Sequence, residues 1–148
     1  MPASSATVNL GEVAAQLRHG VGRLARRLRR EGSAPGASQP QLSALTTIER
    51  HSTMTMGALA AHEQVQPPTM TAIVASLLAE GLVTRTPDPL DRRIAWLVVT
   101  PEGRKLLSRR RRNMDAFLVG RLRALPPEDV ATLERAADII ADLTEEPR

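Results

Sequence analysis

Cysteine and tyrosine are absent from the chain, and Trp96 and Phe117 are its only tryptophan and phenylalanine. The absence of cysteine excludes a disulfide framework, a thiolate zinc site and a thiol redox sensor. The apolar residues make up 42% of the sequence, so the core must be almost wholly aliphatic. Aliphatic residues at helical spacing indicate a mostly helical protein. We expect both large aromatic residues to pack into that core.

Long apolar runs are also absent. The longest, Ala72 to Ala79 with Ser76 inside it, is far too short to span a bilayer. The first ten residues show no basic segment followed by an apolar one, so no secretory signal is apparent. We therefore expect a soluble, cytoplasmic protein without membrane partners.

No residue pattern points to catalysis. The chain shows no nucleophile next to a base, no phosphate-binding glycine loop and no paired carboxylates, and we predict that it is not an enzyme and needs no cofactor. His19, His51 and His62 are far apart and have no metal-ligand spacing, so we predict no metal site. A metal held by histidines across a dimer is the alternative.

Positive charge is present, but almost none of it comes from lysine. Lys105 is the only lysine among 20 basic residues, and the formal net charge is +4. Arginine binds phosphate bidentately, although a GC-rich genome would also favour arginine codons. Four consecutive arginines occupy 109–112, and at 3.6 residues per turn at least one of them must face inward or toward a partner.

Capping residues, proline pairs and apolar periodicity predict six helices and one hairpin. The predicted elements are a helix from Asn9 to a loop at 31–37, a helix capped by Ser38, a short helix capped by Thr55, a helix after Pro67-Pro68 that ends at Gly81, strands at 82–86 and 94–99, a long helix from Thr100 to Leu125, and a helix at 128–143.

The helix after Pro67-Pro68 and the hairpin carry the strongest functional pattern. The inner face of this helix is apolar at Met70, Ile73, Val74, Leu77 and Leu78, whereas its outer face is small and polar. The hairpin tip at 88–93 is basic. A helix that fits a major groove beside a basic tip predicts a winged helix-turn-helix. The fold class is therefore mainly α with a small β-hairpin wing.

Four segments of the sequence resemble the MarR family of bacterial transcriptional regulators. They are TMGALA at 55–60, LLAEGLVTR at 77–85, DPLDRR at 88–93 and LVVTPEG at 97–103. The resemblance implies a homodimer whose helical dimerisation region is formed by residues 1–37 and 100–148, and a winged helix-turn-helix DNA-binding lobe at 38–99. It also implies a pocket for a small aromatic or phenolic effector. Gln66 and Ala72 stand where the family often has a serine cap and a basic residue.

Within this pattern, Asp91 is predicted to orient Arg93, which would enter a narrow minor groove. We expect Arg92 to meet phosphate, and Arg85 to meet phosphate or to form an internal ion pair. Near the helix start, Thr69 and Thr71 can reach bases, whereas Ser38 and Thr55 are helix caps that can also contact phosphate. The predicted DNA-binding residues are Ser38, Thr55, Gln66, Pro68, Thr69, Thr71, Ala72, Arg85, Asp91, Arg92 and Arg93.

The terminal helices carry apolar stripes that flank the compact middle of the chain, and such surfaces usually become buried against a second copy. The predicted dimerisation residues are Leu10, Val13, Leu17, Val21, Leu118, Leu122, Leu133 and Ile140. The sequence thus predicts a sequence-specific regulator of double-stranded DNA, a ligand-responsive repressor that acts as a homodimer on a pseudo-palindromic operator. The alternative is a winged-helix module that binds another protein.

Overall fold

The computed structural model describes residues 8–144, and residues 1–7 and 145–148 lie outside the described part. Both ends of the predicted dimerisation region therefore fall outside it. The chain divides into two compact units, one that ends at Met114 and one that begins at Asp115. The boundary falls within a helix, and each unit is described by itself.

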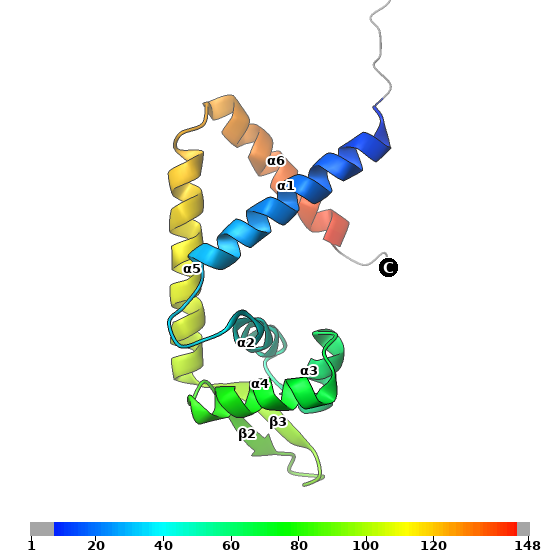
Figure 1. Cartoon of the computed structure of the whole chain (residues 1–148), viewed down its shortest axis with the longest axis vertical. Coiled ribbons are helices and arrows are strands. Elements are labelled where there is room, and N and C mark those ends of the chain that lie inside the picture. Colours follow the sequence, from blue (N-terminus) through cyan, green and yellow to red (C-terminus); the bar gives the residue numbers. More distant parts are fainter. Residues whose placement is uncertain (1–7, 145–148) are drawn as a thin grey trace, which may run out of the picture. The chain divides into compact units, whose positions relative to one another are not determined.

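The structure is mainly helical with a small sheet, as predicted (Figure 1). Its elements are α1 (Leu10–Glu31), α2 (Gln39–His51), β1 (Met54–Thr55), α3 (Met56–His62), α4 (Pro67–Ala79), β2 (Val83–Pro87), β3 (Ala95–Val99), α5 (Pro101–Leu122) and α6 (Pro127–Thr144).

The predicted capping residues explain where the helices begin. The side-chain oxygen Oδ1 of Asn9 accepts the amides of Gly11 and Glu12. Ser38 and Gln41 form a reciprocal capping box at the start of α2, and the Thr55 hydroxyl accepts the Ala58 amide. Each cap satisfies amides that the first helical turn leaves without an internal partner.

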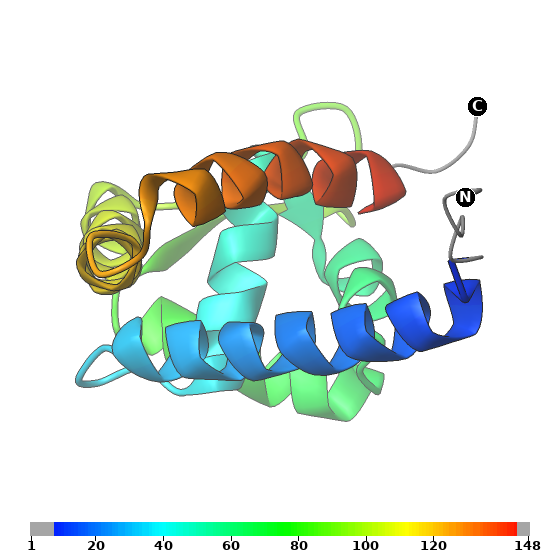
Figure 2. The same cartoon turned by 90° about the horizontal axis from the view of Figure 1, so that it is seen from above.

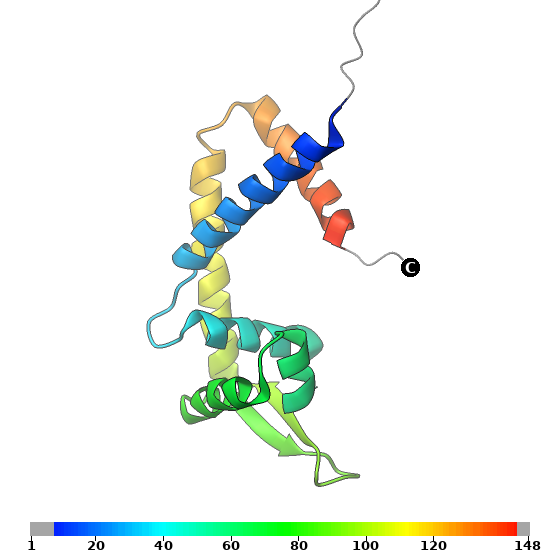
Figure 3. The ribbon, with the colours of Figure 1, turned by 45° about the vertical axis from the view of Figure 1, so that its right-hand side comes forward.

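The sheet has one strand more than the sequence predicted. Its order is β1-β3-β2 and both pairs are antiparallel, with Thr55 opposite Trp96 and Arg85 opposite Leu97. At two residues, β1 is too short to show a periodic pattern, and it forms because the buried Met54 continues the core onto the edge of β3. Figure 3 shows the β2–β3 hairpin extending away from the helices of its lobe.

The core of the first unit is aliphatic, as expected. Its largest fully buried side chains are Leu42, Leu45, Ile48, Leu59, Met70, Leu77, Leu97, Val74 and Val83. Leu106 and Leu107 of α5 belong to the same cluster. The expectation for the aromatic residues was wrong, because Trp96 and Phe117 are only half-buried and neither belongs to this core.

Gly103 allows a close backbone approach between α5 and the base of the hairpin. A Cβ at this position would lie 2.3 Å from the Leu82 carbonyl oxygen and 2.8 Å from a Val99 methyl. The Thr100 hydroxyl accepts the Gly103 amide at 3.0 Å and donates to the Gly81 carbonyl at 2.6 Å. The residues TPEG therefore join the first turn of α5 to the base of the hairpin.

The long helix ends three residues earlier than predicted, at Leu122. The amides of Ala124 and Leu125 bond to carbonyls three residues back, at 3.2 and 3.1 Å, so the chain tightens into a turn before Pro126-Pro127.

The terminal helices α1 and α6 are each continuous (Figure 2). Neither has a buried residue, and in α1 the side chains of Leu10, Val13, Leu17 and Val21 are 78%, 39%, 41% and 43% exposed. No helix between residues 8 and 144 combines the length and the apolar character needed to cross a membrane.

Candidate nucleic-acid interface

The helix α4 presents a small, exposed face opposite its buried one. Met70, Val74 and Leu77 are buried, and α4 packs against α2 and α3. The predicted contact residues Gln66, Pro68, Thr69, Thr71 and Ala72 are all exposed. This face has no bulky side chain in its first two turns, so it can approach the floor of a groove closely.

The side chains of Gln66 and Thr71 differ in how many hydrogen-bonding groups they have free for DNA. Gln66 is the N-cap residue of α4, but its side chain makes no capping hydrogen bond. Its amide group is therefore available to a base or a phosphate. The Thr71 hydroxyl instead donates to the Pro67 carbonyl at 2.9 Å. Thr71 can accept a further hydrogen bond but has no free donor while this bond persists.

The helix α4 ends at Ala79, and the left-handed residue predicted after it is Gly81, which has a φ of 68°. The Gly81 amide bonds to the Leu78 carbonyl at 3.1 Å and the Leu82 amide to the Leu77 carbonyl at 2.9 Å. This pair of bonds is a Schellman motif, and a glycine accommodates its left-handed backbone without steric cost.

The wing is ordered by a carboxylate at its start. Asp88 Oδ1 accepts the amides of Leu90 and Asp91 at 2.8 and 3.0 Å, and its Oδ2 accepts the Trp96 indole N–H at 2.8 Å. The Trp96 hydrogen bond, followed by the two amides, lowers the pKa of Asp88 below its ordinary value of 3.8. Trp96 therefore ties the tip to β3.

The prediction that Asp91 orients Arg93 is confirmed in its geometry. The guanidinium of Arg93 donates from Nε to Asp91 Oδ1 and from Nη2 to Oδ2, both at 3.1 Å. This pairing, with the Arg93 amide, lowers the pKa of Asp91. Because 91% of the Arg93 side chain is still exposed, the cation is oriented without being covered.

The remaining predicted contacts are spread over the lobe. Arg85 and Arg92 are exposed, and Arg85 forms no ion pair with any residue at 8–144, so the structure does not support the internal-pair alternative for Arg85. Thr55 begins α3. Ser38 lies near the C-terminal end of α4, whereas Gln66 lies at its start. The link is Gln41, which bonds to the Ser38 amide and also to Ser76 and Glu80 at the end of α4.

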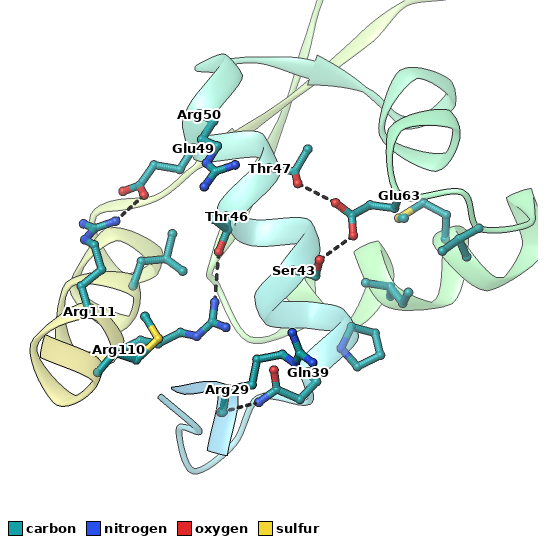
Figure 4. A pocket seen from close by; sticks show the side chains of 16 residues that line it. Arg29, Gln39, Ser43, Thr46, Thr47, Glu49, Arg50, Glu63, Arg110 and Arg111 are labelled. Carbon is teal, nitrogen blue, oxygen red and sulfur yellow. Dashed lines mark hydrogen bonds and ion pairs between the residues drawn. The ribbon is translucent and has the colours of Figure 1, made fainter. Parts of the chain in front are cut away.

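A cavity of about 760 Å³ lies beside α2 (Figure 4). Met70 and Ile73 of α4, Leu107 and Met114 of α5, and polar side chains of α2 line it, together with Arg29 at the end of α1. The resemblance implied a pocket, but the sequence did not identify these lining residues, because they come from positions scattered between 29 and 114.

Arg110 is the inward-facing member of the arginine run. Its Nη1 donates to Thr46 Oγ1 at 3.3 Å, but its buried Nε has no hydrogen-bond partner in the structure. Burial, followed by the nearby positive charge of Arg29, lowers the pKa of Arg110. The neighbouring Arg111 instead pairs with Glu49 at 2.7 Å. Among residues 8–144, no carboxylate pairs with Arg110.

The histidines are partly brought together, which their sequence spacing did not indicate. His51 and His62 meet edge to face with ring centroids 5.2 Å apart, and His62 Nδ1 lies 3.8 Å from Glu63 Oε1. Glu63 is itself bonded to the hydroxyls of Ser43 and Thr47. No group of three or more potential metal ligands occurs within the described residues.

Comparison with known proteins gives a consistent result. Residues 37–95 match the MarR family. An uncharacterised HTH-type transcriptional regulator of Mycobacterium leprae is 42% identical over 134 residues, which cover 90% of this chain and 94% of the relative. An HTH-type transcriptional regulator of Mycobacterium tuberculosis is 40% identical over the same shares of the two chains.

Solved structures of transcriptional regulators have the same fold as this chain. A transcriptional regulator of Pseudomonas aeruginosa has a TM-score of 0.81 at 30% identity, over 92% of this chain and 96% of that one. A mutant of MepR from S. aureus, solved bound to an oligodeoxyribonucleotide, has a TM-score of 0.68 at 17% identity, over 89% and 98% of the two chains. At that identity the likeness to MepR is one of fold.

Proposed function

The chain belongs to the MarR family of transcriptional regulators, which are DNA-binding winged-helix proteins and not enzymes, and on that premise we propose that it is a cytoplasmic, ligand-responsive repressor. It binds a pseudo-palindromic operator as a homodimer. The observation that carries the proposal is the exposed, small-residue face of α4 next to a wing whose Arg93 is oriented by Asp91.

In the proposed complex, α4 enters a major groove and the wing reaches the adjacent minor groove. Gln66 and Thr69 contact base edges or phosphates near the start of α4, and Ala72 leaves room for close approach. Arg93 enters the minor groove, where the negative potential is greatest if the groove is narrow. Arg92 and Arg85 meet phosphates. The oligodeoxyribonucleotide bound by MepR supports this use of the fold.

Dimerisation is supported by the exposed apolar stripes of the terminal helices. In α1 and α6 no residue is buried, and Leu133 is 47% exposed. A second copy would cover these side chains and hold the two α4 helices about one DNA turn apart, roughly 34 Å. Two half-sites then give affinity and specificity that a single lobe cannot reach.

The cavity beside α2 is the proposed effector site. Met70 and Ile73 come from the inner face of α4, so a ligand in the cavity would touch the helix that reads DNA. The unpaired Arg110 and the nearby Arg29 favour a ligand with an acidic group, such as an aromatic carboxylate or an ionised phenol. Such a ligand would shift the dimer toward whichever spacing of the lobes it binds better.

Selection from a pool of random duplexes tests the DNA-binding part of the proposal. We expect a two-fold symmetric consensus that the protein binds with a Kd of about 10⁻⁸ M or tighter at physiological salt. Failure to retain any duplex at low ionic strength would favour the protein-docking alternative, for which the lack of a basic residue at Ala72 is the supporting feature.

Calorimetric titration with benzoate, and with phenol as its mostly neutral counterpart, tests the effector site. We expect benzoate to bind more tightly and Arg110→Gln to weaken benzoate binding by about tenfold, the effect of losing one charge-assisted hydrogen bond. Arg112→Gln, on the same helix but exposed, is the matched control. Equal affinities of the wild type and Arg110→Gln for benzoate would remove Arg110 from the proposed site.

A further inference from the structure

Gln41 connects two helices through a side chain that is almost fully buried. It is 8% exposed, yet both ends of its amide group are hydrogen-bonded. Its Oε1 accepts the Ser38 amide at 2.6 Å, as part of the capping box of α2. Its Nε2 donates to Ser76 Oγ at 2.7 Å and to Glu80 Oε1 at 3.2 Å. Ser76 and Glu80 belong to the last turn of α4 and to its C-cap.

Ser76 and Glu80 are also bonded to each other. The Ser76 hydroxyl donates to Glu80 Oε1 at 3.0 Å while it accepts from Gln41. The three side chains form a closed network in which each donor has an acceptor. A network of this kind has strict geometric requirements, because hydrogen bonds weaken steeply when their angles change.

The other contacts of α4 are less directional. Met70, Val74 and Leu77 bury aliphatic side chains, and dispersion and hydrophobic burial depend on area more than on angle. A rotation of α4 about its axis would break the bonds to Gln41 as well as disturb the packing of these side chains. The polar network therefore adds a directional constraint on the rotation of α4 to the constraint that the apolar core supplies.

We propose that Gln41 is a positioning residue for DNA recognition: through Ser76 and Glu80 it fixes the rotation of α4, and so decides which exposed side chains meet the bases. The inference rests on the proposed function, in which α4 reads the DNA. Two residues earlier, Gln39 Nε2 donates to the Arg29 carbonyl at 3.1 Å, so the same turn of α2 is attached to the end of α1. A change at the end of α1 can thereby reach α4 through Gln41.

A charge swap between two of the network residues tests the proposal. Gln41→Glu keeps the capping box, which accepts glutamate as well as glutamine, but places a second carboxylate beside Glu80. The double variant Gln41→Glu, Glu80→Gln again has one amide and one carboxylate in the network, with the amide now at position 80 and the carboxylate at position 41. Specific and non-specific Kd values are measured on the selected operator and on a scrambled duplex. Each protein concentration is corrected for its active fraction, and the temperature is held well below every melting point.

We expect Gln41→Glu to lower the ratio of specific to non-specific affinity by about tenfold, as for the loss of a buried hydrogen-bonded pair. The double variant should return to within about twofold of the wild type. Ser76→Ala, which keeps or improves helix propensity, should lower the ratio in the same direction. Gln16→Glu, on the exposed surface of α1, adds the same charge and should leave the ratio unchanged.

The outcomes distinguish this inference from the proposed function. If the wild type binds its operator specifically and Gln41→Glu has the same affinity ratio, Gln41 does not position α4. This inference is then overturned, while the proposed function stands. A ratio that stays low in the double variant would overturn it as well. If the wild type binds no duplex, both the proposed function and this inference fail. A purely structural role would change the melting temperature and the active fraction but not the corrected ratio.

Discussion

At the scale of the residue, the role of each arginine depends on whether a carboxylate is near it. Arg93 has Asp91, which orients it toward solvent, and Arg111 has Glu49, which neutralises it. Arg110 has none. The sequence predicted the first pair, because both residues belong to one short hairpin tip. It could show only that some residue of 109–112 must face inward, because the partners of Arg110 and Arg111 come from α2, about 60 positions earlier.

Substitution of the wing arginine tests the first of these roles. We expect Arg93→Ala to weaken operator binding by about 1–3 kcal/mol and to reduce the preference for sequences with a narrow minor groove. Binding is measured by fluorescence anisotropy across a salt titration, in which one lost phosphate-type contact lowers the slope by about one. Asp91→Asn should have a smaller effect in the same direction. An unchanged affinity and slope for Arg93→Ala would contradict the role of the wing.

The wing should also respond to acid. The pKa of folded Asp88 lies below the ordinary value of 3.8, so the folded tip binds this proton less readily than the unfolded chain does. The stabilisation of the folded tip by the ionised Asp88 carboxylate is therefore complete above pH 3.8, and it is lost as the pH falls through the lowered pKa. The Trp96 indole N–H resonance, followed by NMR, should shift in this acid range. Asp88→Asn should abolish the titration, and an indole resonance that titrates equally in this variant would exclude Asp88 as the cause.

At the scale of the element, local chemistry predicted most of the fold and long-range pairing supplied the rest. The caps at Ser38, Thr55 and Thr100 and the left-handed Gly81 were all predicted from adjacent residues, because each is satisfied within three or four positions. The strand β1 was not predicted, since its two residues are ordered by Leu97 and Trp96, about 40 positions later.

The junction between hairpin and α5 makes a stability prediction. Gly103→Ala should destabilise the protein by about 1–3 kcal/mol, because the added Cβ meets a backbone carbonyl that cannot easily move. This cost exceeds the gain in helix propensity of about 1 kcal/mol. Gly57→Ala in α3, where a Cβ meets no heavy atom within 4 Å, is the control and should be neutral or stabilising. Urea unfolding followed by circular dichroism measures the stability of both variants. If Gly103→Ala is as stable as the wild type, the Leu82 backbone can move away from α5 to make room for the Cβ.

At the scale of the whole molecule, the described helices α1 and α6 each carry an apolar stripe, and neither helix has a buried residue. The sequence indicated these stripes correctly, but an apolar stripe does not say what covers it. The residues that line the cavity and the contact between His51 and His62 could not be predicted for a related reason, since each joins elements whose spacing along the chain carries no periodic signal.

The dimer proposal is tested by a charge placed in the α1 stripe. Leu17 is 41% exposed in the single chain and would be buried by a partner. Leu17→Glu should shift the sedimentation coefficient at micromolar concentration from that of a dimer to that of a monomer, because an unpaired buried carboxylate costs several kcal/mol. It should also remove high-affinity binding to the two-half-site operator. Gln16→Glu carries the same charge and should remain dimeric, and a dimeric Leu17→Glu would place the interface elsewhere.

The lone tryptophan has a practical consequence for anyone who follows this protein by its intrinsic fluorescence. Trp96 is half-buried and hydrogen-bonded to Asp88 in the hairpin, outside the aliphatic core, and the chain has no tyrosine. Its emission therefore reports the environment of the hairpin and of the Asp88 contact, and a change in it does not by itself distinguish local melting of the wing from global unfolding. A denaturation curve recorded from tryptophan fluorescence equals the global unfolding curve only if circular dichroism, which follows the helices, gives the same midpoint.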